Sequence, residues 1–222
     1  MKGFNMELET VIGYTFSDKK LLERALTHSS SKSKKNTEDN ERLEFLGDRV
    51  LGLIVAETLL SKFTNESEGD IAKRHTSFVC KEQLVEIAKK ISLTDFIKMS
   101  EGEIREGGKT NESIMADGIE ALLGAIYLDS NIDGAKAFIN KFWDFDVNKE
   151  PPVDAKTAIQ EWAQSKGLGL PEYRLVSQSG TDHNPIFEME VIVTNNKPVK
   201  GQGSNKKEAE KSAAQEFLNN IK

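Results

Sequence analysis

The spacing of apolar residues changes near residue 150, and this change limits the folds that the chain can adopt. Before Pro151-Pro152, apolar side chains recur every three or four residues, which is the period of an α-helix. These helical patterns cover residues 21–28, 41–63, 70–91, 113–128 and 134–143. We therefore expect an all-α domain over residues 1–145. A linker over residues 146–153 should follow, because the proline pair favours an extended chain.

The last third of the chain, residues 154–222, has the pattern of a small α+β domain. Asp154 can cap a helix with one apolar face. Apolar and polar residues then alternate over 187–193, which predicts a half-buried strand, and Asn195-Asn196 suits a hairpin turn. A last helix should begin near residue 205. The predicted order of elements is helix, strands and helix, so this domain is of the α+β class, whereas the first domain is all-α.

Two of the helical patterns place paired carboxylates among mostly apolar side chains. Glu44 and Asp48 share one helix face, and Asp117 and Glu120 share another. The glycines that follow them on these faces are Gly52 and Gly124. The helix over 41–63 is apolar on its other faces and should be largely buried. Carboxylates so close together at the edge of a core repel one another and lose hydration. Both effects favour their protonation at neutral pH unless a cation lies among them.

The counter-charges next to the first pair are Arg42 and Arg49, which lie about 90° around the helix from the acids. They can flank the acids but should not face them. Capping or ion pairing would explain a single acidic pair, whereas two similar pairs favour a metal site. Oxygen ligands favour Mg²⁺, with Mn²⁺ as a substitute, over zinc or copper. Such sites commonly serve phosphoryl chemistry, so the substrate should be a phosphate ester.

Charge and cysteine content restrict the class of protein further. The net charge of −6 belongs wholly to the first part of the chain, because residues 152–222 contain nine basic and nine acidic side chains. A single cysteine rules out an internal disulfide framework. We see no signal peptide and no long apolar span, so we expect a cytoplasmic protein with no membrane partner. Residues 29–40 have no apolar side chain and should form a mobile loop.

A lysine pair, Lys206 and Lys207, falls in the first turn of the last predicted helix. The helix dipole disfavours cations there, so the pair suggests that a polyanion binds end-on. The preceding Gly201-Gln-Gly203 could expose backbone N–H groups to a phosphate. A pair of simply solvated lysines is the alternative explanation, and the neighbouring residues favour the binding site.

These motifs resemble the bacterial ribonuclease III family over nearly the whole chain. The segment Asn40-Glu-Arg-Leu-Glu-Phe-Leu-Gly-Asp48 looks like its signature. Further motifs follow in the family's order: Glu68-Gly-Asp70, Glu112-Ser-Ile-Met-Ala-Asp117 and Glu120-Ala121. Residues 153–221 resemble a double-stranded-RNA-binding domain, through Lys156-Thr-Ala-Ile-Gln-Glu161, His183 and Gly201 to Glu210. One departure is Asn205, where that pattern usually has serine, but asparagine caps helices equally well.

The resemblance implies an N-terminal all-α endonuclease domain and a C-terminal α-β-β-β-α domain that binds double-stranded RNA. It further implies a homodimer that hydrolyses duplex RNA to 5′-phosphate and 3′-hydroxyl ends with a short 3′ overhang. Processing of rRNA precursors and structured messengers would be its role. Two other classes stay open: an RNA-binding protein with an inert nuclease half, and a di-metal oxidoreductase. The second lacks the Glu-x-x-His pairs that di-iron bundles use.

Carried over residue by residue, the resemblance assigns roles to both sets of polar side chains. In the first domain, Glu44, Asp117 and Glu120 would bind Mg²⁺, Asp48 and Glu120 would serve the attack of water, and Glu41 and Glu68 would have secondary roles. In the second domain, Gln160, Glu161 and His183 would address 2′-hydroxyls and groove edges, and Lys206 and Lys207 would meet phosphates.

Overall fold

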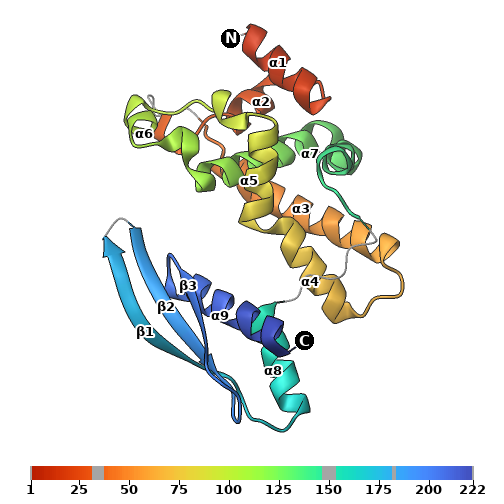
Figure 1. Ribbon diagram of the computed structural model, residues 1–222. Helices are drawn as coiled ribbons and strands as arrows, with labels where there is room; N and C mark the ends of the chain where they lie inside the picture. The colour runs from red at the N-terminus through yellow and green to blue at the C-terminus, as the bar shows by residue number, and fades with distance from the viewer. Residues whose placement is uncertain (1, 32–37, 147–153, 182–183, 222) are drawn as a thin grey trace. The chain divides into compact units, whose positions relative to one another are not determined.

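The computed structural model describes residues 2–31, 38–146, 154–181 and 184–221. The chain forms two compact units, Met1–Pro151 and Pro152–Lys222 (Figure 1). Most of the predicted linker, and also His183, lie outside the described residues. Among the helices in the described ranges, none combines the length and the apolar character that crossing a bilayer requires.

The regular secondary structure described in the first unit is helical, as the spacing of apolar residues predicts. Its helices are α1 (Lys2–Ile12), α2 (Lys19–Ala25), α3 (Glu41–Lys62), α4 (Glu68–Val79), α5 (Lys81–Lys90), α6 (Glu101–Arg105) and α7 (Glu112–Phe142). Three short 3₁₀ turns connect them, at Ser29–Ser31, Leu93–Asp95 and Gly108–Thr110. The helices α1 and α6 were not among the predicted elements. One continuous hydrophobic core joins these helices, apart from α6.

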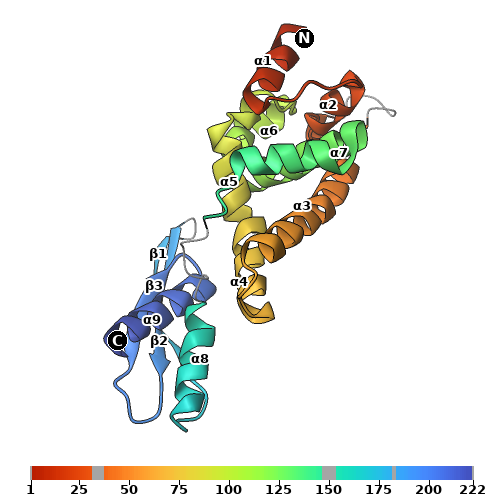
Figure 2. The ribbon, with the colours of Figure 1, turned by 90° about the vertical axis from the view of Figure 1, so that its right-hand side faces the viewer.

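The two long helices α3 and α7 pack against each other at the centre of the first unit (Figure 2). Glycines allow their backbones to touch. A Cβ atom on Gly47 would lie 1.7 Å from the carbonyl oxygen of Glu120, and one on Gly124 would lie 2.2 Å from that of Leu43. Gly52 is not part of this contact, since a Cβ there would meet only His75, at 3.7 Å. The packing glycine of the first helix is therefore Gly47.

Two predicted helices have different boundaries in the structure. The helix expected over 70–91 is two helices, because Cys80 has an extended backbone (φ −71°, ψ 156°). The break lets α4 pack on α3 while α5 packs on α7. The helix expected over 134–143 continues α7 beyond a kink at Asn131, whose φ of 61° and ψ of −158° are not helical. No proline or glycine marks either break in the sequence.

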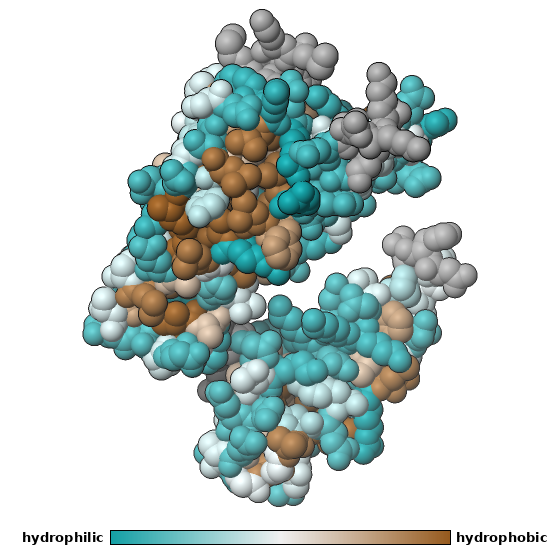
Figure 3. Space-filling model, turned by 180° about the vertical axis from the view of Figure 1, so that it is seen from behind, coloured by the Kyte–Doolittle hydropathy of each residue, from teal (hydrophilic) through white to brown (hydrophobic). Residues whose placement is uncertain are grey.

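The expectation that the helix over 41–63 is largely buried is wrong for one of its faces. Phe45, Leu53 and Leu60 are 65, 61 and 65% exposed, and Leu128 of α7 is 52% exposed. Figure 3 shows a broad hydrophobic area on one face of the first unit. Helical periodicity identified these positions as apolar but did not show that, within the described chain, nothing covers them.

The predicted loop over 29–40 is described only at its two ends, and its second end is not a free polar segment. Asp39 and Asn40 are 6 and 3% exposed. The backbone N–H of Asn40 donates to the carbonyl of Thr27 at 3.0 Å. The chain is therefore fixed just before α3, although no apolar side chain anchors it.

The second unit consists of α8 (Ala155–Ser165), β1 (Glu172–Thr181), β2 (Asn184–Ile192), β3 (Val199–Gly203) and α9 (Lys206–Ile221). The strands form an antiparallel sheet in the order β1-β2-β3. Both helices pack around Ile159, Val191 and Phe217, which are at most 2% exposed. Asp154 caps α8 and Asn195 has a positive φ of 64°, as expected for the cap and the turn. The α-β-β-β-α fold class is confirmed.

Candidate functional site

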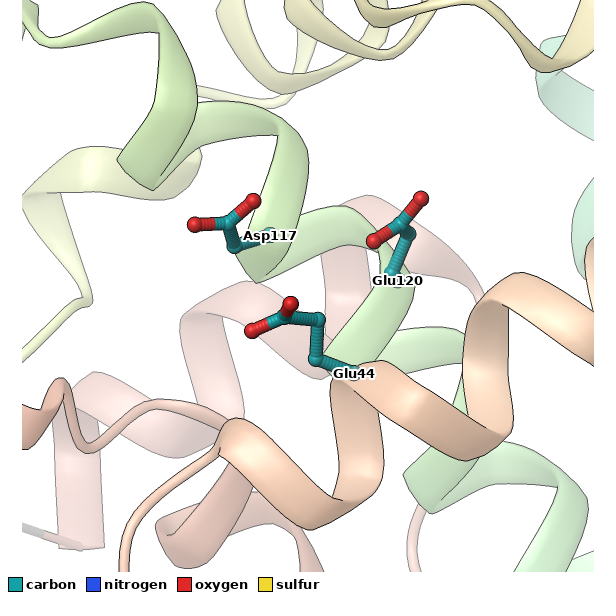
Figure 4. Close-up of side chains that lie close together, drawn as sticks. All are labelled: Glu44, Asp117 and Glu120. Carbon is teal, nitrogen blue, oxygen red and sulfur yellow. The ribbon is translucent and has the colours of Figure 1, made fainter.

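Three carboxylates from the two central helices converge in the first unit. Glu44 comes from the first turn of α3, and Asp117 and Glu120 come from the second and third turns of α7. One oxygen from each lies within 4.8 Å of the other two (Figure 4). The contact at Gly47 and Gly124 brings these helices close enough for the side chains to meet. We call Glu44, Asp117 and Glu120 the carboxylate cluster.

The carboxylate cluster is electrostatically unfavourable in the protein alone. Burial, followed by the charges of Asp48, Asp117 and Glu44, raises the pKa of Glu120 to about 7. Burial and then Asp117 raise the pKa of Glu44, and burial raises the pKa of Asp117. Among the residues that the structure describes, no basic side chain forms an ion pair with any of the three.

The cluster therefore fits a divalent cation. It offers three partly buried oxygen donors that lack a positive partner, and hard cations such as Mg²⁺ and Mn²⁺ prefer oxygen ligands. The candidate ligand group contains neither histidine nor cysteine. Di-iron centres of helical bundles use Glu-x-x-His motifs, so the oxidoreductase alternative receives no support from this geometry.

Asp48 lies beside the carboxylate cluster and not within it. Its carboxylate is 49% exposed and pairs with the guanidinium of Arg49. Arg49 also lies over the ring of Phe45, with its Cζ atom 4.3 Å from the ring centroid. The expectation that Arg49 would not face the acids is therefore wrong, because its long side chain spans the arc of helix that separates it from Asp48.

The two acids with predicted secondary roles are both exposed. Glu41 begins α3, and its negative charge contributes to the raised pKa of Glu44. Glu68 begins α4 and is not a member of the cluster. The described structure therefore brings Glu41, but not Glu68, into the electrostatic environment of the three carboxylates.

Two basic side chains that act electrostatically on Asp117 did not enter the sequence-based site. The charges of Lys81 and His28 both oppose the effect of burial on the pKa of Asp117. The Nζ atom of Lys81 donates to the hydroxyl of Ser113 at 2.9 Å. The ring of His28 is held at Nδ1 by Ser30, at 2.8 Å. One feature of the sequence could have singled out Lys81: a lysine at the first position of a helix is disfavoured by the helix dipole.

Four of the five predicted RNA-binding residues lie in the described part of the second unit, and they are exposed on its two helices. Gln160 and Glu161 lie on the solvent side of α8, and Lys206 and Lys207 occupy the first turn of α9. Asn205 caps α9, because its Oδ1 accepts from the backbone N–H of Glu208 at 2.9 Å. The side chains therefore project into solvent from defined positions.

The glycines before α9 have a different role from the one expected. A Cβ atom on Gly201 would lie 2.0 Å from the backbone nitrogen of Ala213, and one on Gly203 would lie 2.5 Å from that of Ala209. Gly201 is buried and pairs with Met189 in the sheet. These glycines allow α9 to lie directly on β3. Close packing of the helix on the strand therefore explains them, and a phosphate-binding loop is not needed to do so.

One ion pair joins the two helices that carry these polar groups. The Nζ atom of Lys156 on α8 lies 2.6 Å from a carboxylate oxygen of Glu210 on α9. The same ammonium lies 4.6 Å from the ring centroid of Tyr173. This ion pair therefore links the polar side of α8 to α9, which carries the two lysines.

Comparisons with known proteins agree with this arrangement. Residues 18–144 match the family model described as Ribonuclease-III-like, and residues 155–221 match the double-stranded RNA binding motif. The chain is 48% identical over 217 residues to Ribonuclease 3 of Ehrlichia ruminantium (strain Gardel), with 96% of both chains covered. It is 42% identical over 216 residues to Ribonuclease 3 of Caulobacter vibrioides, with 96% of this chain and 94% of the relative covered.

The first unit is also similar to solved structures. The nuclease domain of Ribonuclease III from Campylobacter jejuni is 43% identical, with a TM-score of 0.58, and the match covers 61% of this chain and 93% of that domain. That structure is described as showing flexibility in a region involved in dimer formation. A second structure of the same nuclease domain gives a TM-score of 0.57 at 42% identity, covering 64% of this chain and 97% of that domain.

Proposed function

This chain belongs to the ribonuclease III family, and from that membership and its acidic cluster we propose that it is a metal-dependent endonuclease of double-stranded RNA. One observation carries the proposal: the same chain joins a cluster of unpaired carboxylates to a double-stranded RNA binding motif. The cluster is suited to bind a cation for phosphoryl chemistry, and the motif is suited to bind the RNA duplex. Each would explain only half of the activity without the other.

We assign Mg²⁺ as the cation, with Mn²⁺ as a substitute, and Glu44, Asp117 and Glu120 as its ligands. These three residues would hold the ion, which would supply the activation of water and the stabilisation of charge on the leaving oxygen. Burial raises the pKa of Glu120 to about 7 in the metal-free chain. A bound cation would hold this carboxylate ionised, and its negative charge would then polarise the attacking water. Asp48, beside the cluster, would orient that water through its own carboxylate. Glu41 and Glu68 keep secondary roles in binding substrate or a second subunit.

The second unit would bind the duplex by its shape. Gln160 and Glu161 on α8, together with His183, would contact 2′-hydroxyls and minor-groove edges. Lys206 and Lys207 would contact phosphates across the neighbouring major groove. Both sets lie on elements that the sheet and the Lys156–Glu210 ion pair hold in place.

We further propose a homodimer with one carboxylate cluster in each subunit. The exposed apolar side chains of α3 and α7, among them Phe45, Leu53 and Leu60, would form the contact, since apolar patches of this kind mark interfaces. A two-fold dimer matches the symmetry of a duplex backbone. The two clusters would cut opposite strands, leaving 5′-phosphate and 3′-hydroxyl ends and a short 3′ overhang. Ribosomal RNA precursors and structured messengers in the cytoplasm are the proposed substrates.

The experiment that tests this function compares an end-labelled RNA duplex with its single strand on denaturing gels. We expect cleavage of the duplex in Mg²⁺, and no cleavage of either RNA in Ca²⁺ or with a chelator. A native gel in Ca²⁺ reports binding separately. Binding without cleavage in Mg²⁺ would support the inert-nuclease alternative, and cleavage that survives chelation would contradict the metal assignment.

Replacing both lysines of α9 should weaken duplex binding in a salt-dependent way. If Lys206 and Lys207 each neutralise one phosphate, the double variant K206M/K207M should reduce the slope of log K against log salt by about 2. Lys197→Met is the matched control, because the register of β2 and β3 places its turn at the end of β3 opposite the one that leads into the first turn of α9. An unchanged slope in the double variant would contradict the phosphate assignment. The measurement is a titration of labelled duplex in Ca²⁺ at several salt concentrations.

A further inference from the structure

Lys81 is a cation near the carboxylate cluster to which the proposed mechanism gives no role. It is the first residue of α5. The unpaired N–H groups and the dipole of a helix start disfavour a positive charge at this position. Cys80, the N-cap residue, makes no side-chain hydrogen bond to the start of α5, although Glu82 places one negative charge in the first turn. Since Lys81 is exposed, its side chain could turn into solvent, yet it is directed toward α7.

The position of the Lys81 ammonium is fixed by a neutral partner. Its Nζ atom donates to the hydroxyl of Ser113 at 2.9 Å. Ser113 precedes Asp117 by four residues in α7, and residues with this spacing lie on one helix face with Cβ atoms about 6 Å apart. The helix α5 packs directly against α7. The ammonium therefore lies about one helical turn from a member of the cluster.

The charge of Lys81 is available to a ligand. Within the described ranges it forms no ion pair, whereas Lys89 on the same helix lies 3.9 Å from Glu86 and 3.8 Å from Glu112. An ammonium has three N–H donors, and the contact with Ser113 uses one. A hydroxyl partner sets the position of the group without neutralising it. Two donors and a full positive charge can thus meet an anion bound at the cluster.

We propose that Lys81 is a further catalytic residue, whose ammonium donates to a non-bridging oxygen of the scissile phosphate, and that Ser113 positions it. The inference rests on the proposed function. In that reaction the oxygen of a water molecule bonds to phosphorus, and the bond from phosphorus to the 3′ oxygen breaks. The water gives up a proton, and the 3′ oxygen takes one from solvent. Lys81 keeps its protons and stabilises the negative charge that gathers on the non-bridging oxygens.

The test measures single-turnover cleavage of a labelled duplex in Mg²⁺, at saturating enzyme, for full-length variants. Lys81→Met should slow this step by about 100-fold, because a fixed donor to a charged transition state is lost. Its duplex affinity in Ca²⁺ should change by less than about threefold, since only one phosphate contact is removed. Lys81→Arg should recover part of the rate. Lys89→Met, at an exposed position of the same helix, is the control and should cleave like the parent.

A second pair of variants tests the positioning role. Ser113→Ala should slow the saturated step by about tenfold, with its melting temperature unchanged, and Ser113→Thr should retain the rate because it keeps the hydroxyl. Lys81→Met cleaving at the parent rate would overturn the inference alone, and so would an equal loss of rate and affinity. A parent protein that does not cleave in Mg²⁺ would overturn the proposed function as well.

Discussion

Glu120→Gln should abolish duplex cleavage, with a loss of at least about 1000-fold, while duplex binding persists. Glutamine keeps the shape of the side chain but has no negative charge to hold a divalent cation and no charged oxygen to polarise the attacking water. Glu120 serves both purposes in the proposed site, so no other single carboxylate should matter more. Denaturing gels in Mg²⁺ measure cleavage, and native gels in Ca²⁺ measure binding.

Two further variants make the Glu120 result specific. Glu112→Gln, in the first turn of the same helix, removes an exposed carboxylate that lies 3.8 Å from Lys89, and it should cleave like the parent. Asp48→Asn should also lose cleavage, but Asp48 lies outside the carboxylate cluster. It should therefore keep the rise in melting temperature that Mg²⁺ causes, whereas Glu120→Gln should lose it. Cleavage at the parent rate by Glu120→Gln would refute the assignment.

The same substitution should stabilise the metal-free protein at high pH. The pKa of Glu120 is raised to about 7 in the folded chain, above its ordinary value of 4.5. The protonated side chain of Glu120 therefore favours the folded chain fully below about pH 4.5. This stabilisation is lost as the pH rises from 4.5 to 7, because over this range the carboxyl ionises in the unfolded chain but stays protonated in the folded chain. In chelator at pH 8, Glu120→Gln should thus unfold with a free energy up to about 3 kcal/mol above the parent. Thermal melts at pH 4 and pH 8 measure this difference, which should be close to zero at the lower pH.

Gly47→Ala should cause the largest loss of stability among single-methyl changes at the centre of the first unit. The added Cβ atom would lie 1.7 Å from the carbonyl oxygen of Glu120. Backbone atoms have little freedom to move aside, so α3 and α7 must separate. We expect a loss of more than about 3 kcal/mol in the free energy of unfolding. The melting temperature of this unit should fall by about 10 °C, and cleavage should fall with it because the cluster spans both helices.

Gly52→Ala is the matched control on the same helix. Its added Cβ atom would meet only His75, at an ordinary contact distance of 3.7 Å. Alanine has the higher helix propensity by about 1 kcal/mol, so this variant should be as stable as the parent or slightly more stable. Equal melting temperatures for Gly47→Ala and Gly52→Ala would contradict the close approach of α3 and α7.

Periodicity and local chemistry were sufficient for the outline of the fold. The 3.6-residue spacing before residue 150 predicts helices, and the alternation over 187–193 predicts a strand, because these patterns are properties of neighbouring residues. Capping by Asp154 and Asn205 is equally local, and the structure confirms both caps. Local patterns did not predict the break at Cys80. That break depends on which neighbouring helix each segment packs against.

The sequence by itself determined that acidic pairs lie at the edge of an apolar core, and it gave the order of the two domains. Only the tertiary structure decided which acids meet. It joins Glu44 to Asp117 and Glu120, pairs Asp48 with Arg49, and directs Lys81 toward Ser113. It also decided that Gly47 and not Gly52 lies in the helix contact. The physical reason is that a helix face is fixed by sequence spacing, whereas the distance between two faces is fixed by the side chains and backbones that pack between them.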